Sequence, residues 1–211
     1  QYSKEDHGIF KKDIDPDVLT ISDTLISNGY QAFVVGGCIR DMLLGKTPKD
    51  FDIATDASPP EICKLFNKAK IIGRRFKIVH VYTSERKYFE VTTFRSDVKK
   101  KTNEKKFKKI QGMLKRDNVY GSISQDAFRR DFTINSLYLD LDSEILHDYV
   151  NGLDDIKNKK LRLIKKPSIS YQEDPVRMLR ALRFESKLGL KLTSECKQPI
   201  TEMAHMINNV S

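Results

Sequence analysis

Two aspartates, Asp50 and Asp52, stand one residue apart in an apolar run and are the first residues whose spacing could do chemistry. Alternate residues of a β-strand share a face, so the two carboxylates would point the same way. Upstream, Gly36 and Gly37 end another apolar run, and Arg40 follows just inside a predicted helix. Carboxylates beside a glycine turn that lets backbone N–H groups approach phosphate predict a site for magnesium and a phosphorylated ligand.

A third carboxylate, Glu90, alternates with Phe89 and Val91 in a later strand pattern. On a strand that neighbours Asp50 and Asp52, it would complete a set able to hold two magnesium ions about 4 Å apart. Mg²⁺ takes few protein ligands and fills its shell with water and substrate phosphate, so three acids suffice. Such ions activate an attacking hydroxyl and stabilise charge on the phosphate under attack, which predicts nucleotide transfer.

Each of these features has an ordinary explanation when it is taken alone. Two aspartates can simply be solvated at a surface, a double glycine can serve a plain turn, and Glu90 could be an edge charge or part of a structural ion pair. His80 fits a packed strand residue better than a catalytic base, and Cys38 has no expected catalytic role. The order and spacing of all the features together favour nucleotide transfer.

The composition limits the class of protein and of partner. The chain has 211 residues, 39% hydrophobic and 32% charged, and lacks any apolar run of the roughly eighteen residues that a membrane span needs. Three widely spaced cysteines, an odd number without CxxC spacing, predict a reduced cytoplasmic protein without structural zinc. The net charge of +9 favours a polyanionic partner.

Periodicity and capping residues predict an α+β fold. The expected helices cover 16–29, 39–44, 59–67, 124–130 and 194–207. A further helix is expected from Asp174, with Val176, Leu179, Leu182 and Phe184 on its apolar side. The expected strands cover 32–35, 51–54, 70–72, 76–82, 88–94, 137–141, 145–150 and 161–164. We expect one hairpin between 76–82 and 88–94 and another between 137–141 and 145–150. Residues 1–14 carry little pattern, and we expect this segment to be partly disordered.

A basic stretch interrupts this pattern at residues 96–118. Nine Lys or Arg residues fall between Lys99 and Arg116, with almost no apolar periodicity. We expect a mobile loop that is either solvated only or contacts nucleic-acid phosphate, and the sequence leaves both open.

Several blocks resemble one family in the right order. GGCIRD at 36–41 followed by DFD at 50–52 resembles the signature of the class II tRNA nucleotidyltransferase/poly(A) polymerase family. RRDFTIN at 129–135 resembles its ribose-selecting motif, and EDPVRMLRALRF at 173–184 resembles its nucleobase-selecting helix. IIGRRFKIVHV at 71–81 resembles the version in bacterial poly(A) polymerases, whereas CCA-adding relatives usually carry a glycine-threonine-valine run after the Phe.

The resemblance covers about residues 8–200 and implies a particular architecture. It implies a nucleotidyltransferase-type mixed β-sheet with flanking helices as a catalytic head over 1–165, followed by the start of an all-helical neck over 166–211. Pro167 and nearby serines interrupt the pattern at the expected boundary. Because a helical pattern is still present near the last residue, we expect the chain to be part of a longer protein.

Carried over by matching position, the resemblance also implies roles for individual residues. Asp50 and Asp52 would bind two Mg²⁺ ions, with Glu90 as a third ligand by fold logic, and Asp131 would act beside the ribose hydroxyls. The implied nucleotide-binding residues are Gly36, Gly37, Arg40, Arg130, Asp174, Arg177, Arg180 and Arg183. Of these, Asp174 and Arg177 would read the base edge, since an acid and an arginine at i, i+3 share a helix face and offer acceptors and donors. A basic helix face against RNA is the alternative for the arginines.

The implied function is a template-independent poly(A) polymerase that adds AMP from ATP to an RNA 3′ end, with Mg²⁺ as cofactor. CCA addition to tRNA by the same chemistry is the first alternative. An alternative is a non-catalytic RNA-binding module that keeps the fold, and such a module would be expected to have lost its active-site acids. Four candidate acids are present here: Asp50, Asp52, Glu90 and Asp131. A sugar-transferring enzyme with a metal-binding DxD leaves the blocks at 129–135 and 173–184 unexplained.

Overall fold

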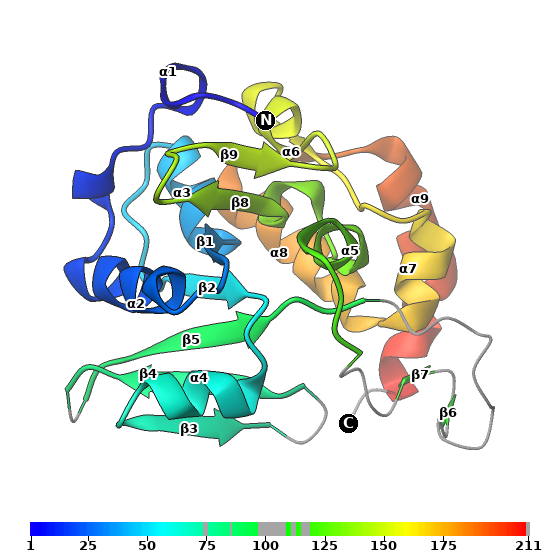
Figure 1. Ribbon diagram of the computed structural model, residues 1–211. Coiled ribbons are helices and arrows are strands. Elements are labelled where there is room, and N and C mark those ends of the chain that lie inside the picture. The colour runs from blue at the N-terminus through cyan, green and yellow to red at the C-terminus, as the bar shows by residue number, and fades with distance from the viewer. Residues whose placement is uncertain (74–75, 85, 97–108, 111–112, 115–118, 210–211) are drawn as a thin grey trace.

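The structure is a computed structural model that describes residues 1–73, 76–84, 86–96, 109–110, 113–114 and 119–209. Its centre is a mixed seven-stranded sheet, which Figure 1 shows running from β9 at the top to β3 at the bottom. In sheet order the strands are β3 (Ala69–Ile72), β4 (Ile78–Tyr82), β5 (Tyr88–Thr93), β2 (Asp52–Thr55), β1 (Ala32–Val35), β8 (Leu137–Asp140) and β9 (Leu146–Asp148). Neighbouring strands are antiparallel except β2 and β5, which run parallel.

Helices flank this sheet, as the sequence predicts for the α+β class. They are α1 (Lys4–His7), α2 (Pro16–Ser27), α3 (Gly37–Leu43), α4 (Pro59–Leu65), α5 (Ile123–Arg129), α6 (Gly152–Lys157), α7 (Pro167–Glu173), α8 (Val176–Leu188) and α9 (Ser194–Met203). Shorter elements are the 3₁₀ turns η1 (Lys11–Asp13), η2 (Thr133–Asn135) and η3 (Ala204–Asn209) and the paired strands β6 (Lys109–Ile110) with β7 (Met113–Leu114) and β10 (Lys160–Leu161) with β11 (Lys191–Leu192). In Figure 1, α7 and α9 lie at the right of the sheet.

Side-chain alternation along the strands builds two hydrophobic cores on opposite faces of the sheet. The larger core takes one face and includes Val34 and Ile53 from β1 and β2. The smaller core includes Val35 and Ala54 from the same strands, packed with Ala127 of α5. Because Asp52 is two residues from Ala54, it lies on the face of the smaller core.

Local sequence explains where several elements begin. The predicted capping box of α4 is confirmed, because the Ser58 backbone N–H donates to Glu61 Oε2 at 2.7 Å. Pro16 opens α2 behind an Asp15 side chain that accepts from the Asp17 N–H. Gly189, with φ 71°, ends α8 in the left-handed conformation that favours glycine.

The expectation for residues 1–14 is wrong. The segment forms α1 and η1, and Tyr2 bridges to Leu146 of β9. Ile9 and Ile14 are buried in the larger core. These two apolar residues are too far apart to show a helical or strand period, so only the tertiary structure reveals their packing.

The C-terminal helices also differ from expectation. Pro167 does not interrupt structure but opens α7, since proline fits the first turn of a helix. α8 then begins at Val176 rather than Asp174. Leu179 and Leu182, placed by sequence on the apolar side, are 49% and 43% exposed. The buried face of α8 instead consists of Met178, Ala181, Phe184 and Leu188.

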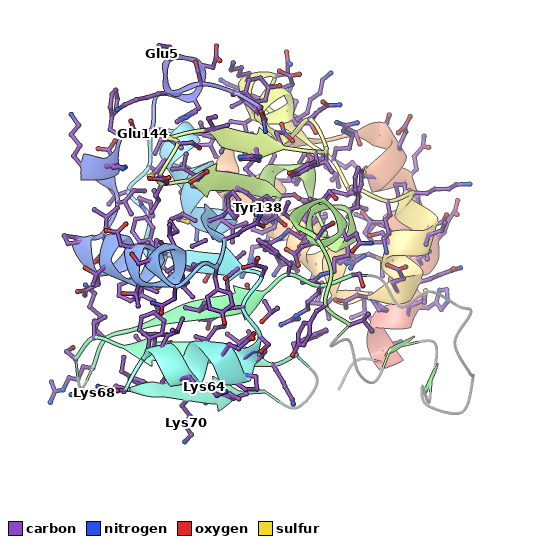
Figure 2. All side chains as sticks on the ribbon, viewed as in Figure 1. Glu5, Lys64, Lys68, Lys70, Tyr138 and Glu144 are labelled. Carbon is purple, nitrogen blue, oxygen red and sulfur yellow. The ribbon has the colours of Figure 1, made fainter. Side chains whose placement is uncertain are left out.

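Several lysines near one edge of the sheet lie on the outside of the molecule. Figure 2 shows Lys64, Lys68 and Lys70 extending from α4 and the β3 edge, while Tyr138 lies in the interior. Most of the predicted basic loop at 96–118 lies outside the described residues, so its contact with nucleic acid stays a prediction. Within the described ranges, no helix is long and apolar enough to cross a membrane.

Candidate active site

The strand register brings two of the predicted carboxylates together. Asp52 is the first residue of β2, and its partner in register on β5 is Glu90. Glu90 pairs in turn with His80 of β4, whose Nε2 lies 3.5 Å from Glu90 Oε1. Partners in register share a face, so the three side chains form a row across three strands. Glu90 thus lies on the strand next to Asp52, as expected, and its role as a metal ligand stays a prediction.

Asp50 lies in the same cleft as Asp52 and Glu90 but outside the sheet. It lies before β2, which begins at Asp52, so the expectation that both aspartates belong to one strand is wrong. Strand alternation therefore does not set the direction of the Asp50 side chain. Nevertheless, Asp50, Asp52 and Glu90 line one cleft of about 630 Å³.

The charges in this cleft favour a cation. Burial raises the pKa of Asp52 to about 6; Glu90 acts in the same direction, Arg130 opposes the rise, and Asp50 adds to it. Among the described residues, no three His, Cys, Asp or Glu side chains form a ready-made metal cage. A magnesium ion bound by these acids would need water and substrate phosphate to complete its shell.

The glycine turn lies directly against Asp52. Gly36 adopts φ 85° and ψ −130°, a conformation that strongly favours glycine. A Cβ atom at this position would lie 3.7 Å from Asp52 Oδ2 and 3.6 Å from Arg130 Nη1. The turn thus places the start of α3 between a carboxylate and a guanidinium, with no side chain of its own filling the space.

Arg40 is held in place by other parts of the chain. Its Nη1 donates to Asn135 Oδ1 at 2.6 Å, while Nε and Nη2 donate to Asp41 Oδ1 at 2.9 and 2.7 Å. The guanidinium also lies 5.2 Å from the centroid of the Phe184 ring. Arg40 therefore connects three motif blocks that are far apart in the sequence: 36–41, 129–135 and 173–184.

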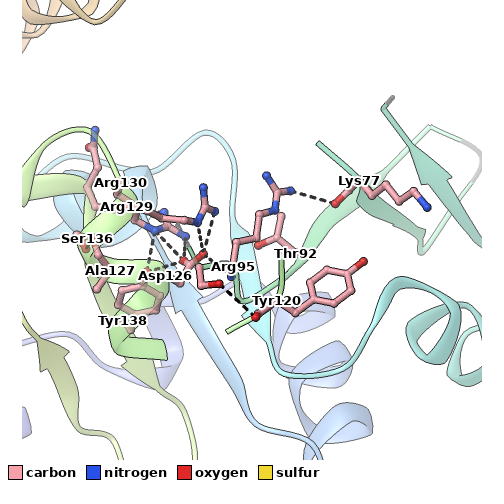
Figure 3. Close-up of polar contacts among 12 residues, drawn as sticks. Lys77, Thr92, Arg95, Tyr120, Asp126, Ala127, Arg129, Arg130, Ser136 and Tyr138 are labelled. Atoms are coloured by element: carbon pink, nitrogen blue, oxygen red, sulfur yellow. Dashed lines mark hydrogen bonds and ion pairs between the residues drawn. The ribbon is translucent and has the colours of Figure 1, made fainter. Parts of the chain in front are cut away.

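A buried carboxylate that the sequence analysis missed fixes Arg130. Asp126 Oδ2 accepts from Arg130 Nε at 3.1 Å and from the Tyr138 hydroxyl at 2.6 Å, while Oδ1 accepts from Arg129 Nη2 at 2.8 Å (Figure 3). Burial by itself raises the pKa of Asp126, but Arg130 and Arg129 outweigh it and bring the value to about 2. The sequence signal that could have predicted this ion pairing is the spacing of Asp126 three residues before Arg129 and four before Arg130.

Asp131 links the 129–135 block to α8. Its Oδ2 accepts from Arg180 Nε at 2.7 Å, and its Oδ1 accepts from the Phe132 N–H and from Asn135 Nδ2 at 2.7 and 3.2 Å. Arg180 Nη2 makes a second contact of 2.7 Å with the same carboxylate. Asp131, predicted beside the ribose hydroxyls, and Arg180, predicted among the nucleotide-binding residues, therefore form an ion pair.

The structure does not pair the side chains of Asp174 and Arg177. Asp174 has extended backbone, and its Oδ1 accepts from the Val176 N–H at 3.1 Å. Arg177 Nη1 instead donates to Ser170 Oγ at 2.8 Å and lies 3.4 Å from Glu173 Oε2. The predicted i, i+3 arrangement on one helix face is wrong because Asp174 precedes α8.

Phe184 is a second residue that the sequence analysis left without a role in the site. The guanidinium groups of Arg40, Arg180 and Arg183 lie 5.2, 5.3 and 5.3 Å from its ring centroid. Phe132 contacts the same ring edge-on at 5.4 Å. Phe184 thus gathers three of the predicted arginines, an arrangement that their spacing alone does not reveal.

Comparisons with known proteins agree with this geometry. The chain is 45% identical over 211 residues to poly(A) polymerase I of Escherichia coli O6:H1, covering 98% of this chain and 45% of that protein. It is 38% identical over 193 residues to the CCA-adding enzyme of Bacillus pumilus, covering 92% and 46%. A crystal structure of the Bacillus stearothermophilus CCA-adding enzyme in complex with CTP matches with a TM-score of 0.78 at 31% identity, covering 94% and 46%.

The chain thus spans about half the length of the relatives it matches. The family described as the poly(A) polymerase head domain matches residues 32–162, a range that holds the glycine turn, the Asp52–Glu90 pair and Asp131. These observations place the chain in the poly(A) polymerase head domain family.

Proposed function

We propose that this protein is a poly(A) polymerase, an enzyme that adds AMP from ATP to RNA 3′ ends without a template. The observation that carries the proposal is the register pairing of Asp52 with Glu90 beside the Gly36 turn. The relative named poly(A) polymerase I, at 45% identity, supports adenylate addition over other forms of nucleotide transfer. Three free cysteines are in keeping with action in the cytoplasm.

Asp50, Asp52 and Glu90 would hold two magnesium ions. When bound, the metals activate the RNA 3′-hydroxyl and stabilise charge on the α-phosphate of ATP during an in-line displacement that releases pyrophosphate. Gly36 leaves room for the phosphates to approach the backbone, and Arg130 holds a positive charge beside Asp52. No covalent intermediate with the protein is needed.

The remaining nucleotide contacts belong to the same proposal. Gly37 and Arg40 would position the triphosphate, and Asp131 would act beside the ribose hydroxyls. Asp174 and Arg177 would read the base edge, and Arg180 and Arg183 lie farther along α8 than Arg177. We also propose a catalytic head over 1–165 and a helical neck from 166 onward, which share the larger hydrophobic core.

The test of this function is nucleotide choice. The whole protein should be given each single NTP with a generic RNA and, separately, with tRNA lacking its CCA end. We expect ATP alone to be incorporated, and on the generic RNA. The second candidate, CCA addition, is favoured by the match to a CCA-adding enzyme in complex with CTP. Incorporation of CTP as well as ATP would establish this second function and contradict the first.

Arg177 offers a prediction about base selection. Ser170 and Glu173 hold its Nη1, which fixes the position of the guanidinium. Arg177→Ala should relax nucleotide choice more than it lowers ATP turnover, because it removes donors to the base edge and leaves the carboxylates intact. The measurement is the ratio of kcat/KM for ATP to that for CTP, GTP and UTP. A variant with unchanged ratios and a large loss of kcat would move Arg177 from selection to chemistry.

A further inference from the structure

Aromatic rings lie beside the acidic residues on the open face of β4 and β5. Along β4, His80 alternates with Tyr82, and the two pair in register with Glu90 and Tyr88 of β5. Residues that alternate along a strand, and partners in register, share one face. The intervening residues are all buried in the larger core on the other face: Val79, Val81, Phe89 and Val91.

The rings form an ordered stack. Tyr88 lies on His80 with ring centroids 4.1 Å apart and planes 13° from parallel. Tyr82 contacts both rings, with centroids at 6.3 and 5.7 Å. His80 also lies close to Glu90, so its ring is held both by the tyrosine rings and by this carboxylate. Tyr88 is nevertheless 48% exposed, which leaves a flat aromatic surface of defined orientation for a ligand.

This surface is continuous with the acidic cleft. Tyr88 lines the same 630 Å³ cleft as Asp52 and Glu90. Lys49 and Arg86 line it too, and they supply positive charge for a phosphate backbone. Aromatic rings on which bases stack, beside cations that follow the backbone, are the general features of single-strand nucleic-acid binding.

The position of Tyr88 indicates which nucleotide it would bind. In the sheet, β2 with Asp52 separates β5 and β4, where Tyr88 and His80 lie, from β1, which the Gly36 turn follows. Arg130, at the end of α5, has its Nη1 3.6 Å from where a Gly36 Cβ atom would lie. In-line displacement puts the attacking and leaving oxygens on opposite sides of the phosphate. With the triphosphate on the β1 side, the attacking RNA end therefore approaches from the side of β5 and β4.

We propose that Tyr88, stacked on His80, is the platform for the base at the 3′ end of the RNA primer. The proposal rests on the proposed function for the direction of approach. The fixed ring orients the terminal nucleotide so that its 3′-hydroxyl reaches the Asp52–Glu90 pair. Stacking is tolerant of base identity because every base has an aromatic face, so the platform accepts any terminal base.

The test measures RNA affinity and primer use in the whole protein. Loss of one stacked base costs about 1–3 kcal/mol, so Tyr88→Ala should weaken binding of a fluorescently labelled oligoadenylate about tenfold. The KM for primer should rise by a similar factor, while the KM for ATP stays unchanged. Tyr88→Trp keeps a stacking ring and should retain the affinity. Thermal unfolding of both variants checks that each is folded.

A matched control uses an exposed ring at the other edge of the sheet. Phe10 is 42% exposed and lies beside Lys4, which binds Glu144 after β8. Phe10→Ala should leave RNA affinity unchanged. Equal weakening by Phe10→Ala and Tyr88→Ala, or a folded Tyr88→Ala variant with the affinity of the unchanged protein, would overturn the platform. A rise in KM for ATP alone would assign the ring to the incoming nucleotide and overturn it as well.

The outcomes separate this proposal from the proposed function. If the protein binds oligoadenylate through Tyr88 but transfers no nucleotide, the platform stands and the proposed function fails. If it transfers AMP and Tyr88→Ala changes neither affinity nor primer KM, the function stands and the platform fails. If the protein does not bind oligoadenylate at all, the platform is wrong.

Discussion

Asp52→Asn lowers the rate of AMP incorporation by about a thousandfold or more, the scale expected when a group that stabilises transition-state charge is lost. Asp52 lies at the centre of the site, in register with Glu90 and 3.7 Å from where a Gly36 side chain would begin. An amide of the same shape keeps the packing but removes the negative charge that would bind metal. The measurement is single-turnover incorporation of ATP onto an RNA primer with saturating Mg²⁺.

The same variant should be more stable than the unchanged protein at neutral pH. The folded-state pKa of Asp52 is raised to about 6, above the ordinary value of about 3.9, so ionisation of Asp52 favours unfolding. The free energy of unfolding therefore falls as pH rises from about 4 to 6 and stays lower above that. Asparagine removes this dependence and should add about 3 kcal/mol at pH 7 and almost nothing below about pH 3.

The expected loss of activity together with a gain in stability separates a chemical effect from a structural one. An inactive variant that unfolds at a higher denaturant concentration has lost chemistry and not structure. Asp50→Asn and Glu90→Gln test the other two proposed ligands by the same incorporation assay. If the double replacement of Asp50 and Asp52 by Ala left incorporation intact, the two-metal assignment would be wrong.

Asp126→Ala should have the largest effect on stability. Asp126 is buried, with a side chain 3% exposed, and it neutralises Arg130 while accepting from Tyr138. Removing one partner of a buried ion pair leaves the other charge uncompensated and typically costs about 3–5 kcal/mol. The free energy of unfolding, measured by urea denaturation at pH 7, should fall by that amount. The KM for ATP should rise too, because Arg130 loses the group that fixes it.

Asp155 provides the matched control. It is also a buried aspartate, and it accepts from Thr133 Oγ1 at 2.6 Å and from Arg162 Nε at 3.0 Å. Asp155→Ala should destabilise the protein but leave the KM for ATP unchanged in the folded fraction. Asp126→Asn, which keeps acceptors for Arg130, should recover part of the stability. If Asp126→Ala lowered stability without changing the KM, Asp126 would be a structural residue alone.

Acid titration checks the same carboxylate. The folded-state pKa of Asp126, about 2, lies below its ordinary value. Its contribution to stability is therefore present above about pH 3.9 and lost as pH falls through about 2. The difference in unfolding free energy between the unchanged protein and Asp126→Asn should shrink over that range.

The sequence by itself determined the local elements and supplied the candidate residues of the site. Strands 32–35 and 88–94 and the helix from Pro16 follow from alternation, capping and proline placement, which act over a few residues. The motif blocks predicted the acids and the glycine turn because each block is continuous in the chain. The pairing of Glu90 with the strand that follows Asp50 was also within reach, since a hairpin next to a short strand leaves few arrangements.

Only the tertiary structure decided which groups meet across the fold. Asp131 contacts Arg180, and Arg40 contacts Asn135, over 49 and 95 residues of sequence. No period or spacing encodes such contacts, because they depend on how α3, η2 and α8 pack together. The same packing turned Leu179 outward and Phe184 inward. A helix shows which residues share a face, but the surface it packs against selects the face that is buried.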